Sequence, residues 1–263
     1  MPLNVLVCVK RVPTTGGRIT VTADGQDIDT RFLGFTVSPH EECAVEEAVR
    51  LIERFGGSTT VLTLGPAQAV EQLQDAMALG IDRGILLETG GEDWDPSATA
   101  AAIVEAIRSA EADANAGGEP FDLVLFGNEA ADTGDYQVGI RVAQALGRPC
   151  VSGVKALEVD ADAGTAAARR EAPGGWEVFG FPLPAVVTVK EGINLPRFPS
   201  LPGRVRARKK EILRVGPARR EGGLRKVRLH VPKEQERAVE VLGHGPDAVP
   251  RVVEVLQRLG VLS

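Results

Sequence analysis

Short apolar runs alternate along the chain with longer segments of helical periodicity. The apolar runs, rich in Val, Leu and Ile, cover residues 3–9, 59–64, 84–88, 121–126 and 185–189. Because they are apolar at nearly every position, they are typical of parallel strands covered by helices on both faces. The pattern therefore predicts an α/β fold of three layers with a mostly parallel, Rossmann-like sheet in the middle.

The segments between the strands carry helix signals. Ser38, Pro39 and Glu41 form a capping-box pattern, which predicts a helix that starts there and ends at a pair of glycines. Further helices are predicted over residues 66–79, 96–110 and 136–146, and near the carboxyl terminus over 246–259. Residues 154–178 are punctuated by Asp and Gly, which predicts a β-hairpin or small meander.

The composition changes after residue 190. Between Arg197 and Arg228, twelve Lys or Arg residues face only two glutamates. Four prolines in or next to this stretch interrupt regular structure. We therefore expect an α/β domain over residues 1–190 and an extended arm over 191–263 that ends in a helix.

Charge and cysteine content limit the classes of partner and location. A formal net charge of -6 argues against a surface built for nucleic acid or anionic membrane. No apolar stretch approaches the roughly 18 residues of a membrane helix and no signal peptide is evident, so no membrane insertion is expected. Three cysteines, an odd number, do not indicate a secreted disulfide framework. A cytoplasmic protein is predicted.

Several common sites are excluded by motif. The sequence has no Gly-x-Gly-x-x-Gly after the first strand, no Walker loop, no nucleophile elbow and no His-Glu-x-x-His. His40 and Cys43 lie one helical turn apart, but the other ligands of a zinc site are missing, so no metal is expected. Cys8 and Cys150 have no candidate base nearby in the sequence, so a catalytic thiolate is not expected.

Candidate binding chemistry lies in the loops that follow the strands. In an open parallel sheet, ligands bind beyond the carboxyl ends of the strands, where the next helix presents unpaired N–H groups. Residues 127–139 contain three glycines, a hydroxyl and a polar cluster before a helix, which suits a phosphate cradle. The pattern also fits a loop in which Asp135 caps the helix and the glycines only form turns. Spacing alone slightly favours this second alternative, because glycine-rich loops before helices are common.

The start of the basic arm carries apolar residues between prolines. Leu195, Phe198 and Leu201 lie within this stiffened segment, residues 194–203. Exposed apolar residues on a rigid loop are typical of a surface that a partner protein recognises. The alternative is that these side chains fold back onto the core. The arm has few aromatic residues, which disfavours RNA binding.

Seven sequence blocks together resemble a known family. They are LVCVKRV at 6–12, AVEEAVRL at 44–51, LGPAQ at 64–68, ALGIDRG at 78–84, LPAVVTV at 183–189, PRF at 196–198 and ARKK at 207–210. In register from about residue 4 to residue 213, the chain resembles the small (beta) subunit of electron transfer flavoproteins.

The resemblance implies a heterodimer. Beta subunits pair with a larger alpha subunit that holds most of an FAD. The pair carries electrons from flavin dehydrogenases, such as acyl-CoA dehydrogenases, to a membrane-bound quinone oxidoreductase. The resemblance also implies that the beta subunit binds a structural AMP and is an electron carrier subunit rather than an enzyme.

The same resemblance places the AMP pocket on the strand ends singled out above. Its residues are Cys8, Ser38, Pro39, His40, Glu41, Leu64, Gly127, Asn128, Glu129, Asp132, Thr133, Gly134, Asp135, Tyr136, Gln137 and Val138. Partner docking is placed on Leu195, Arg197, Phe198 and Leu201, with Leu201 as the anchor.

Two departures from the family pattern bear on the cofactors. His40 stands where the family often has an aromatic residue near the flavin, so that contact is not carried over. The Gln-Val-Gly at 137–139 is shared with electron-bifurcating members, in which a second FAD takes the AMP position. AMP is favoured, with a second FAD as the alternative. Outside the family, the alternatives are an adenine-nucleotide enzyme that uses Asp132 and Asp135, or a stand-alone nucleotide-binding module.

Overall fold

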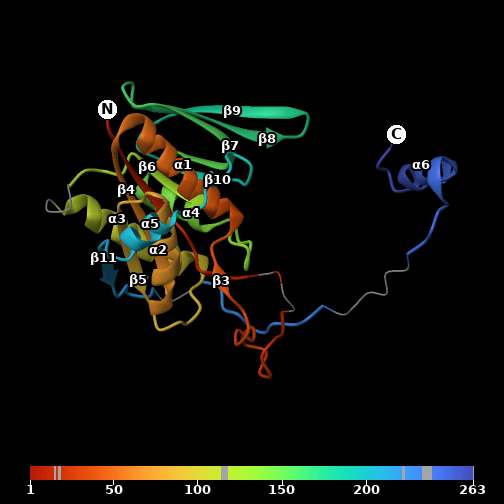
Figure 1. Cartoon of the computed structure of the whole chain (residues 1–263), viewed down its shortest axis with the longest axis horizontal. Coiled ribbons are helices and arrows are strands. Elements are labelled where there is room, and N and C mark those ends of the chain that lie inside the picture. Colours follow the sequence, from red (N-terminus) through yellow and green to blue (C-terminus); the bar gives the residue numbers. More distant parts are fainter. Residues whose placement is uncertain (15, 17–18, 114–117, 221–222, 233–238, 263) are drawn as a thin grey trace. The chain divides into compact units, whose positions relative to one another are not determined.

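The computed structural model describes residues 1–14, 16, 19–113, 118–220, 223–232 and 239–262 (Figure 1). The chain divides into two units, Met1–Arg228 and Leu229–Ser263, and each is described by itself. The boundary expected near residue 190 falls inside the first unit, because a helix and a strand that follow it pack against the α/β layers.

The first unit is built on one large sheet. Among the described residues nine strands pair in the order β11-β5-β4-β1-β6-β10-β7-β8-β9. They are β1 (Leu3–Cys8), β4 (Gly57–Gly65), β5 (Arg83–Glu88), β6 (Leu123–Gly127), β7 (Cys150–Asp160), β8 (Thr165–Ala172), β9 (Gly175–Pro182), β10 (Ala185–Val189) and β11 (Ile212–Val215). Neighbours from β11 to β7 run parallel, and β8 and β9 continue the sheet antiparallel. A separate ribbon pairs β2 (Val12–Pro13) with β3 (Phe35–Thr36). The predicted α/β class with a mostly parallel sheet is confirmed.

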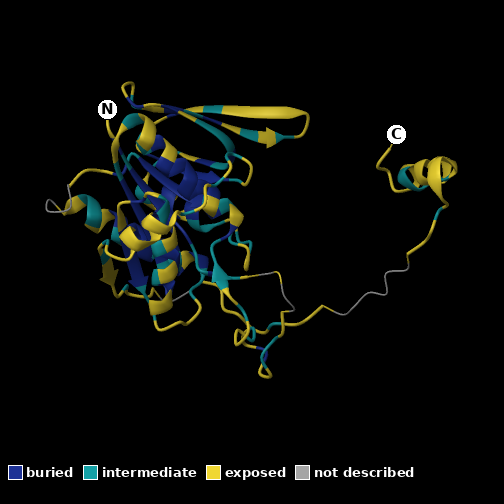
Figure 2. Ribbon diagram, in the orientation of Figure 1, coloured by how far each residue is buried: buried dark blue, intermediate teal, exposed yellow. Residues whose placement is uncertain are grey.

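Helices cover both faces of this sheet and complete three layers. They are α1 (Pro39–Phe55), η1 (Ala67–Ala69), α2 (Val70–Leu79), α3 (Pro96–Ala112), α4 (Val138–Leu146) and α5 (Leu201–Ala207). One buried cluster joins α1, α2 and α5 to Val5 and Val7 of β1, and another joins α3 and α4 to Leu6 and Cys8. Since alternate residues of a strand face opposite sides, β1 lies at the centre of the core, among the dark blue strands of Figure 2.

Local sequence signals explain the bounds of the helices. Ser38 is the N-cap of α1, and its N–H donates to the Glu41 carboxylate at 2.9 Å, as in a capping box. The helix ends at Gly56, whose φ of 71° favours glycine. Asp95 caps α3 by accepting a hydrogen bond from the Ser97 N–H. The helix predicted over 66–79 is divided into η1 and α2.

Two segments contain more regular structure than the sequence indicates. The meander predicted over 154–178 is longer, since β7, β8 and β9 form three antiparallel strands, with β9 at one end of the sheet. The basic arm contains α5 and β11, and β11 pairs with β5. Pro202 lies in the first turn of α5, where a missing N–H breaks no helical bond, so this proline is compatible with a helix start.

The second unit contains η3 (Gly245–Ala248) and α6 (Val249–Arg258), which accounts for the predicted terminal helix. No residue of α6 is buried, and Val249, Val252 and Val253 are exposed. Within the described parts of the chain, no helix is both long and apolar enough to span a membrane.

Candidate functional site

The carboxyl ends of neighbouring strands meet at one edge of the sheet. Cys8 of β1 pairs with Leu62 of β4 and Phe126 of β6, and β6 runs parallel to β10. The loops that leave these strands therefore start at the same edge. Cys8 is buried and Leu64 is partly buried there. Burial raises the pKa of the Cys8 thiol, so the thiol stays protonated and does not act as a nucleophile.

The start of α1 is packed tightly against the end of β6. A Cβ atom at Gly127 would lie 2.6 Å from Glu41 Cγ and 3.2 Å from His40 Cβ, so only glycine fits. The Ser38 hydroxyl donates to the Glu129 carbonyl at 3.2 Å, and His40 Nε2 lies 3.6 Å from Glu129 Oε1. The structure thus brings the capping box and the loop after β6 into contact.

Glu41 is a buried carboxylate at this edge. Its oxygens accept hydrogen bonds from the Lys10 N–H at 2.8 Å and the Ser38 N–H at 2.9 Å. Burial raises the pKa of Glu41 to about 7, although these hydrogen bonds favour the ionised form. Glu41 therefore changes charge near neutral pH at the point where the loops meet.

Glu41→Gln is expected to alter the pH dependence of stability. Because burial raises the pKa from 4.5 to about 7, the folded wild type binds this proton more tightly than the unfolded chain and loses stability as the pH rises through that window. The variant has no such group. As the pH rises from about 4.5 to about 7, its free energy of unfolding relative to wild type should therefore increase by up to about 3 kcal/mol. Thermal melts at several pH values test this, with exposed Glu105→Gln as the control. Parallel curves for wild type and Glu41→Gln would contradict it.

The loop after β6 is ordered by its own contacts. Lys10 Nζ lies 2.7 Å from Asp132 Oδ2, and the Thr133 N–H donates to Asp132 Oδ1 at 2.8 Å. Gly134 and Tyr136 adopt positive φ values of 59° and 56°. A hydrogen bond to the Glu129 side chain raises the pKa of Tyr136. These contacts fix the loop before α4 begins.

Helix α4 begins without a side-chain cap. Its N-cap is Gln137, so the alternative in which Asp135 caps the helix is wrong. The Gln137 side-chain oxygen Oε1 instead accepts hydrogen bonds from Arg141 Nε at 3.1 Å and Arg141 Nη2 at 2.9 Å. A Cβ atom at Gly139 would lie 2.9 Å from Thr188 Cγ2, so this helix start packs closely on β10. The first N–H groups of α4 have no intrahelical partner and lie at the positive end of the helix dipole.

A pocket of about 250 Å³ lies beside this helix start. It is lined by Asn128, Tyr136, Ile140, Ser152, Gly153, Arg170, Glu171 and Lys190. The Thr188 hydroxyl donates to Asn128 Oδ1 at 2.8 Å and accepts from the Gly153 N–H at 3.1 Å, which fixes one wall. Sequence reasoning missed Ser152 and Arg170, because β7 and β8 carry no local signal for a site. Lys190 directly follows a predicted strand and could have been found.

The structure gives little support to a metal site or to the enzymatic alternative at this edge. In the described residues no group of three or more His, Cys, Asp or Glu side chains could hold a metal ion. Asp132, one of the two carboxylates of the enzymatic alternative, is paired with Lys10. Pro39 is exposed at the first turn of α1. The edge offers helix N–H groups and polar side chains to a ligand.

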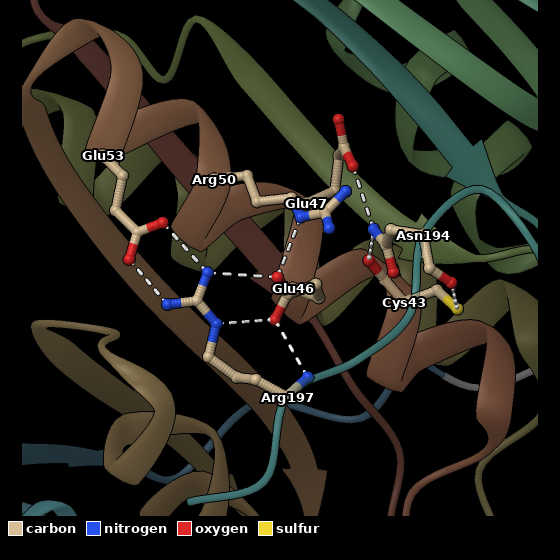
Figure 3. Close-up of polar contacts among 7 residues, drawn as sticks. All are labelled: Cys43, Glu46, Glu47, Arg50, Glu53, Asn194 and Arg197. Carbon is tan, nitrogen blue, oxygen red and sulfur yellow. Dashed lines mark hydrogen bonds and ion pairs between the residues drawn. The ribbon is translucent and has the colours of Figure 1, made fainter.

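The start of the basic arm carries three exposed apolar side chains. Leu195, Phe198 and Leu201 are 84%, 96% and 81% exposed, so the alternative in which they fold back onto the core is wrong. Arg197 differs from them, because its guanidinium bonds to two glutamates of α1 (Figure 3).

Comparisons with known proteins agree over most of the chain. The family model described as electron transfer flavoprotein domain matches residues 29–219. The chain is 30% identical to the electron transfer flavoprotein subunit beta of Bacillus subtilis (strain 168) over 266 residues, which cover 97% of this chain and 98% of the relative. It is 34% identical to the corresponding subunit of Syntrophomonas wolfei over 244 residues, or 92% and 90% of the two chains. It is 33% identical to the mitochondrial beta subunit of Arabidopsis thaliana over 214 residues, or 81% of each. The chain therefore belongs to the electron transfer flavoprotein family, among its beta subunits.

Proposed function

We propose that this chain is the small subunit of a heterodimeric electron carrier that acts in the cytoplasm. The carrier receives electrons from flavin dehydrogenases, such as acyl-CoA dehydrogenases, and delivers them to a membrane-bound quinone oxidoreductase. FAD, held mainly by the alpha subunit, supplies the redox chemistry. This chain contributes a structural AMP site and a docking segment, and it is a carrier subunit rather than an enzyme.

The residues at the sheet edge fit a nucleoside monophosphate. The uncapped start of α4 is the observation that carries this assignment, because helix N–H groups bind an anion without Lys or Arg in the loop. His40 Nδ1 is buried without a hydrogen-bond partner in the described structure, which provides a polar atom for a ribose or base. Asn128 lines the adjacent pocket.

Gln137→Asp is expected to lower the AMP content of the purified heterodimer at least severalfold while its FAD content stays constant. An aspartate at the N-cap accepts the helix N–H groups itself and repels a phosphate, yet it stabilises the helix. The matched control is Gln144→Asp, the same change at an exposed position of α4. The measurement is chromatography of the nucleotides released on denaturation.

The nucleotide content of the wild-type heterodimer also separates the candidate functions. One FAD and one AMP support the proposal. Two FAD support the electron-bifurcating alternative, which the Gln-Val-Gly at 137–139 favours. FAD alone would show that the edge is not a nucleotide site. Equal AMP content in wild type and Gln137→Asp would contradict the assignment of the phosphate site to the start of α4.

The start of the basic arm supports the docking role. Leu195, Phe198 and Leu201 present apolar surface, and several cationic residues follow them on α5 and in the turn after it. Those residues are Arg204, Arg206, Arg208 and Lys209. A basic rim around apolar anchors favours an acidic partner surface and makes the encounter rate depend on salt.

A further inference from the structure

Asn194 ties the chain to α1 immediately before the first exposed apolar residue of the arm (Figure 3). Its side-chain amide donates to the Cys43 carbonyl at 3.0 Å and to Glu47 Oε2 at 2.9 Å. The Cys43 thiol lies 3.8 Å from the Asn194 carbonyl oxygen. Asn194 is therefore held from both its side chain and its backbone.

Arg197, three residues after Asn194, forms a second attachment to α1 through Glu46. The Glu46 side chain is only 3% exposed, and it accepts hydrogen bonds from Arg197 Nε at 2.9 Å, Arg197 Nη2 at 3.1 Å and the Arg197 backbone N–H at 3.2 Å. Arg50 Nε also donates to Glu46, at 2.9 Å. Burial opposes ionisation, yet the bonds from Arg197 and Arg50 hold the pKa of Glu46 below its ordinary value.

The guanidinium of Arg197 is shared between two carboxylates. Besides Glu46 it binds Glu53 through Nη1 at 2.6 Å and Nη2 at 2.9 Å. These bonds, first those to Glu53, raise the pKa of Arg197. A planar guanidinium that binds a carboxylate on each of two sides has one permitted orientation, and a lysine ammonium does not reproduce it.

We infer that Arg197 is a positioning residue, which clamps the arm onto α1 and thereby holds Leu195 and Phe198 outward for a partner dehydrogenase. This rests on the docking role proposed above, and it replaces the expectation that Arg197 itself contacts the partner. Glu46 is buried while the Arg197 side chain is 37% exposed, so we assign this ion pair a role in specifying one arrangement of the arm rather than a large contribution to stability. Holding the apolar residues in place before the encounter removes the entropy loss of ordering them on binding.

The test measures the mobility of the segment and the docking step in the same FAD-containing heterodimer. Mobility is the hydrogen exchange of the amide at position 197, read by mass spectrometry on the peptide over 191–200. Docking is the KM for the heterodimer as acceptor from an acyl-CoA dehydrogenase, measured beside kcat. For Arg197→Ala we expect about tenfold faster exchange and about tenfold higher KM, with kcat and FAD content unchanged.

Two matched variants separate a clamp from a simple charge effect. Arg197→Lys keeps the positive charge but loses the planar guanidinium, so its hydrogen exchange and KM should match those of Arg197→Ala. Arg50→Ala removes another partner of Glu46 without touching the arm, so it should behave like wild type. If Arg197→Ala does not assemble, Glu46→Gln, which preserves volume, is measured in its place.

The outcomes distinguish the clamp from the docking proposal beneath it. Unchanged exchange in Arg197→Ala, or full rescue by Arg197→Lys, would overturn the clamp. Faster exchange with an unchanged KM would also overturn it, provided that Leu201→Ala raises the KM. An unchanged KM in Leu201→Ala, or a wild-type heterodimer that accepts no electrons, would instead contradict the proposed docking function.

Discussion

A chain that ends at Arg228 is expected to lose its alpha subunit while its own α/β fold is retained. The two buried clusters lie entirely in the first unit, so removing residues 229–263 deletes none of that core. The deleted helix α6 carries Val249, Val252 and Val253, which are 57%, 39% and 37% exposed. Together these three side chains expose little more than the surface of one whole valine, so covering them contributes about 2 kcal/mol, or roughly thirtyfold in affinity.

Copurification with the alpha subunit and size-exclusion chromatography measure this loss, and far-UV circular dichroism checks the fold. Val252→Lys in the full chain should weaken assembly in the same direction. Glu254→Lys, on the opposite side of the same helix, should not. A truncated chain that still binds the alpha subunit with full affinity would rule out this role for the terminal unit.

Leu201→Ala is expected to reduce electron transfer from an acyl-CoA dehydrogenase ten- to a hundredfold when the carrier is limiting. Leu201 is 81% exposed at the first position of α5, so its truncation leaves no cavity in the free carrier. Ser200 still caps the helix through the Gly203 N–H at 3.1 Å. A leucine buried in a partner pocket contributes about 1.5 to 3 kcal/mol, which gives this range.

The control for this variant is Leu213→Ala, the same truncation at a 54% exposed position of β11. Transfer rates over a series of carrier concentrations should converge at saturation for wild type and Leu201→Ala. Rates that are equal at low concentration, or a Leu201→Ala heterodimer that loses FAD, would show that the segment is structural.

The central part of the fold could be predicted because its signals are local. Parallel strands buried on both faces are apolar throughout, and the Ser38 to Glu41 pattern marks the start of α1 by itself. β11 could not be found in this way. Its four residues are mostly exposed and include Arg214, and the strand forms because β5 leaves an open edge beside it.

The candidate site, too, could be predicted only where its signals are local. The loop after β6 could be located from its glycines and its place after a strand. The partners of Arg197 could not, because Glu46 lies 151 residues away along the chain and only the fold brings them together. A basic stretch in a sequence shows where cations are but not which of them are already neutralised by the core.

The position of β9 at the end of the sheet has a consequence for this subunit at high concentration. Trp176 and Val178 on this strand are 56% and 65% exposed, and its single charged residue, Glu177, is paired with Arg170. One backbone edge of β9 has no neighbouring strand among the described residues. Such an edge is a template for another copy of itself. At high concentration, copies of this chain would therefore tend to associate through edge-to-edge pairing of β9.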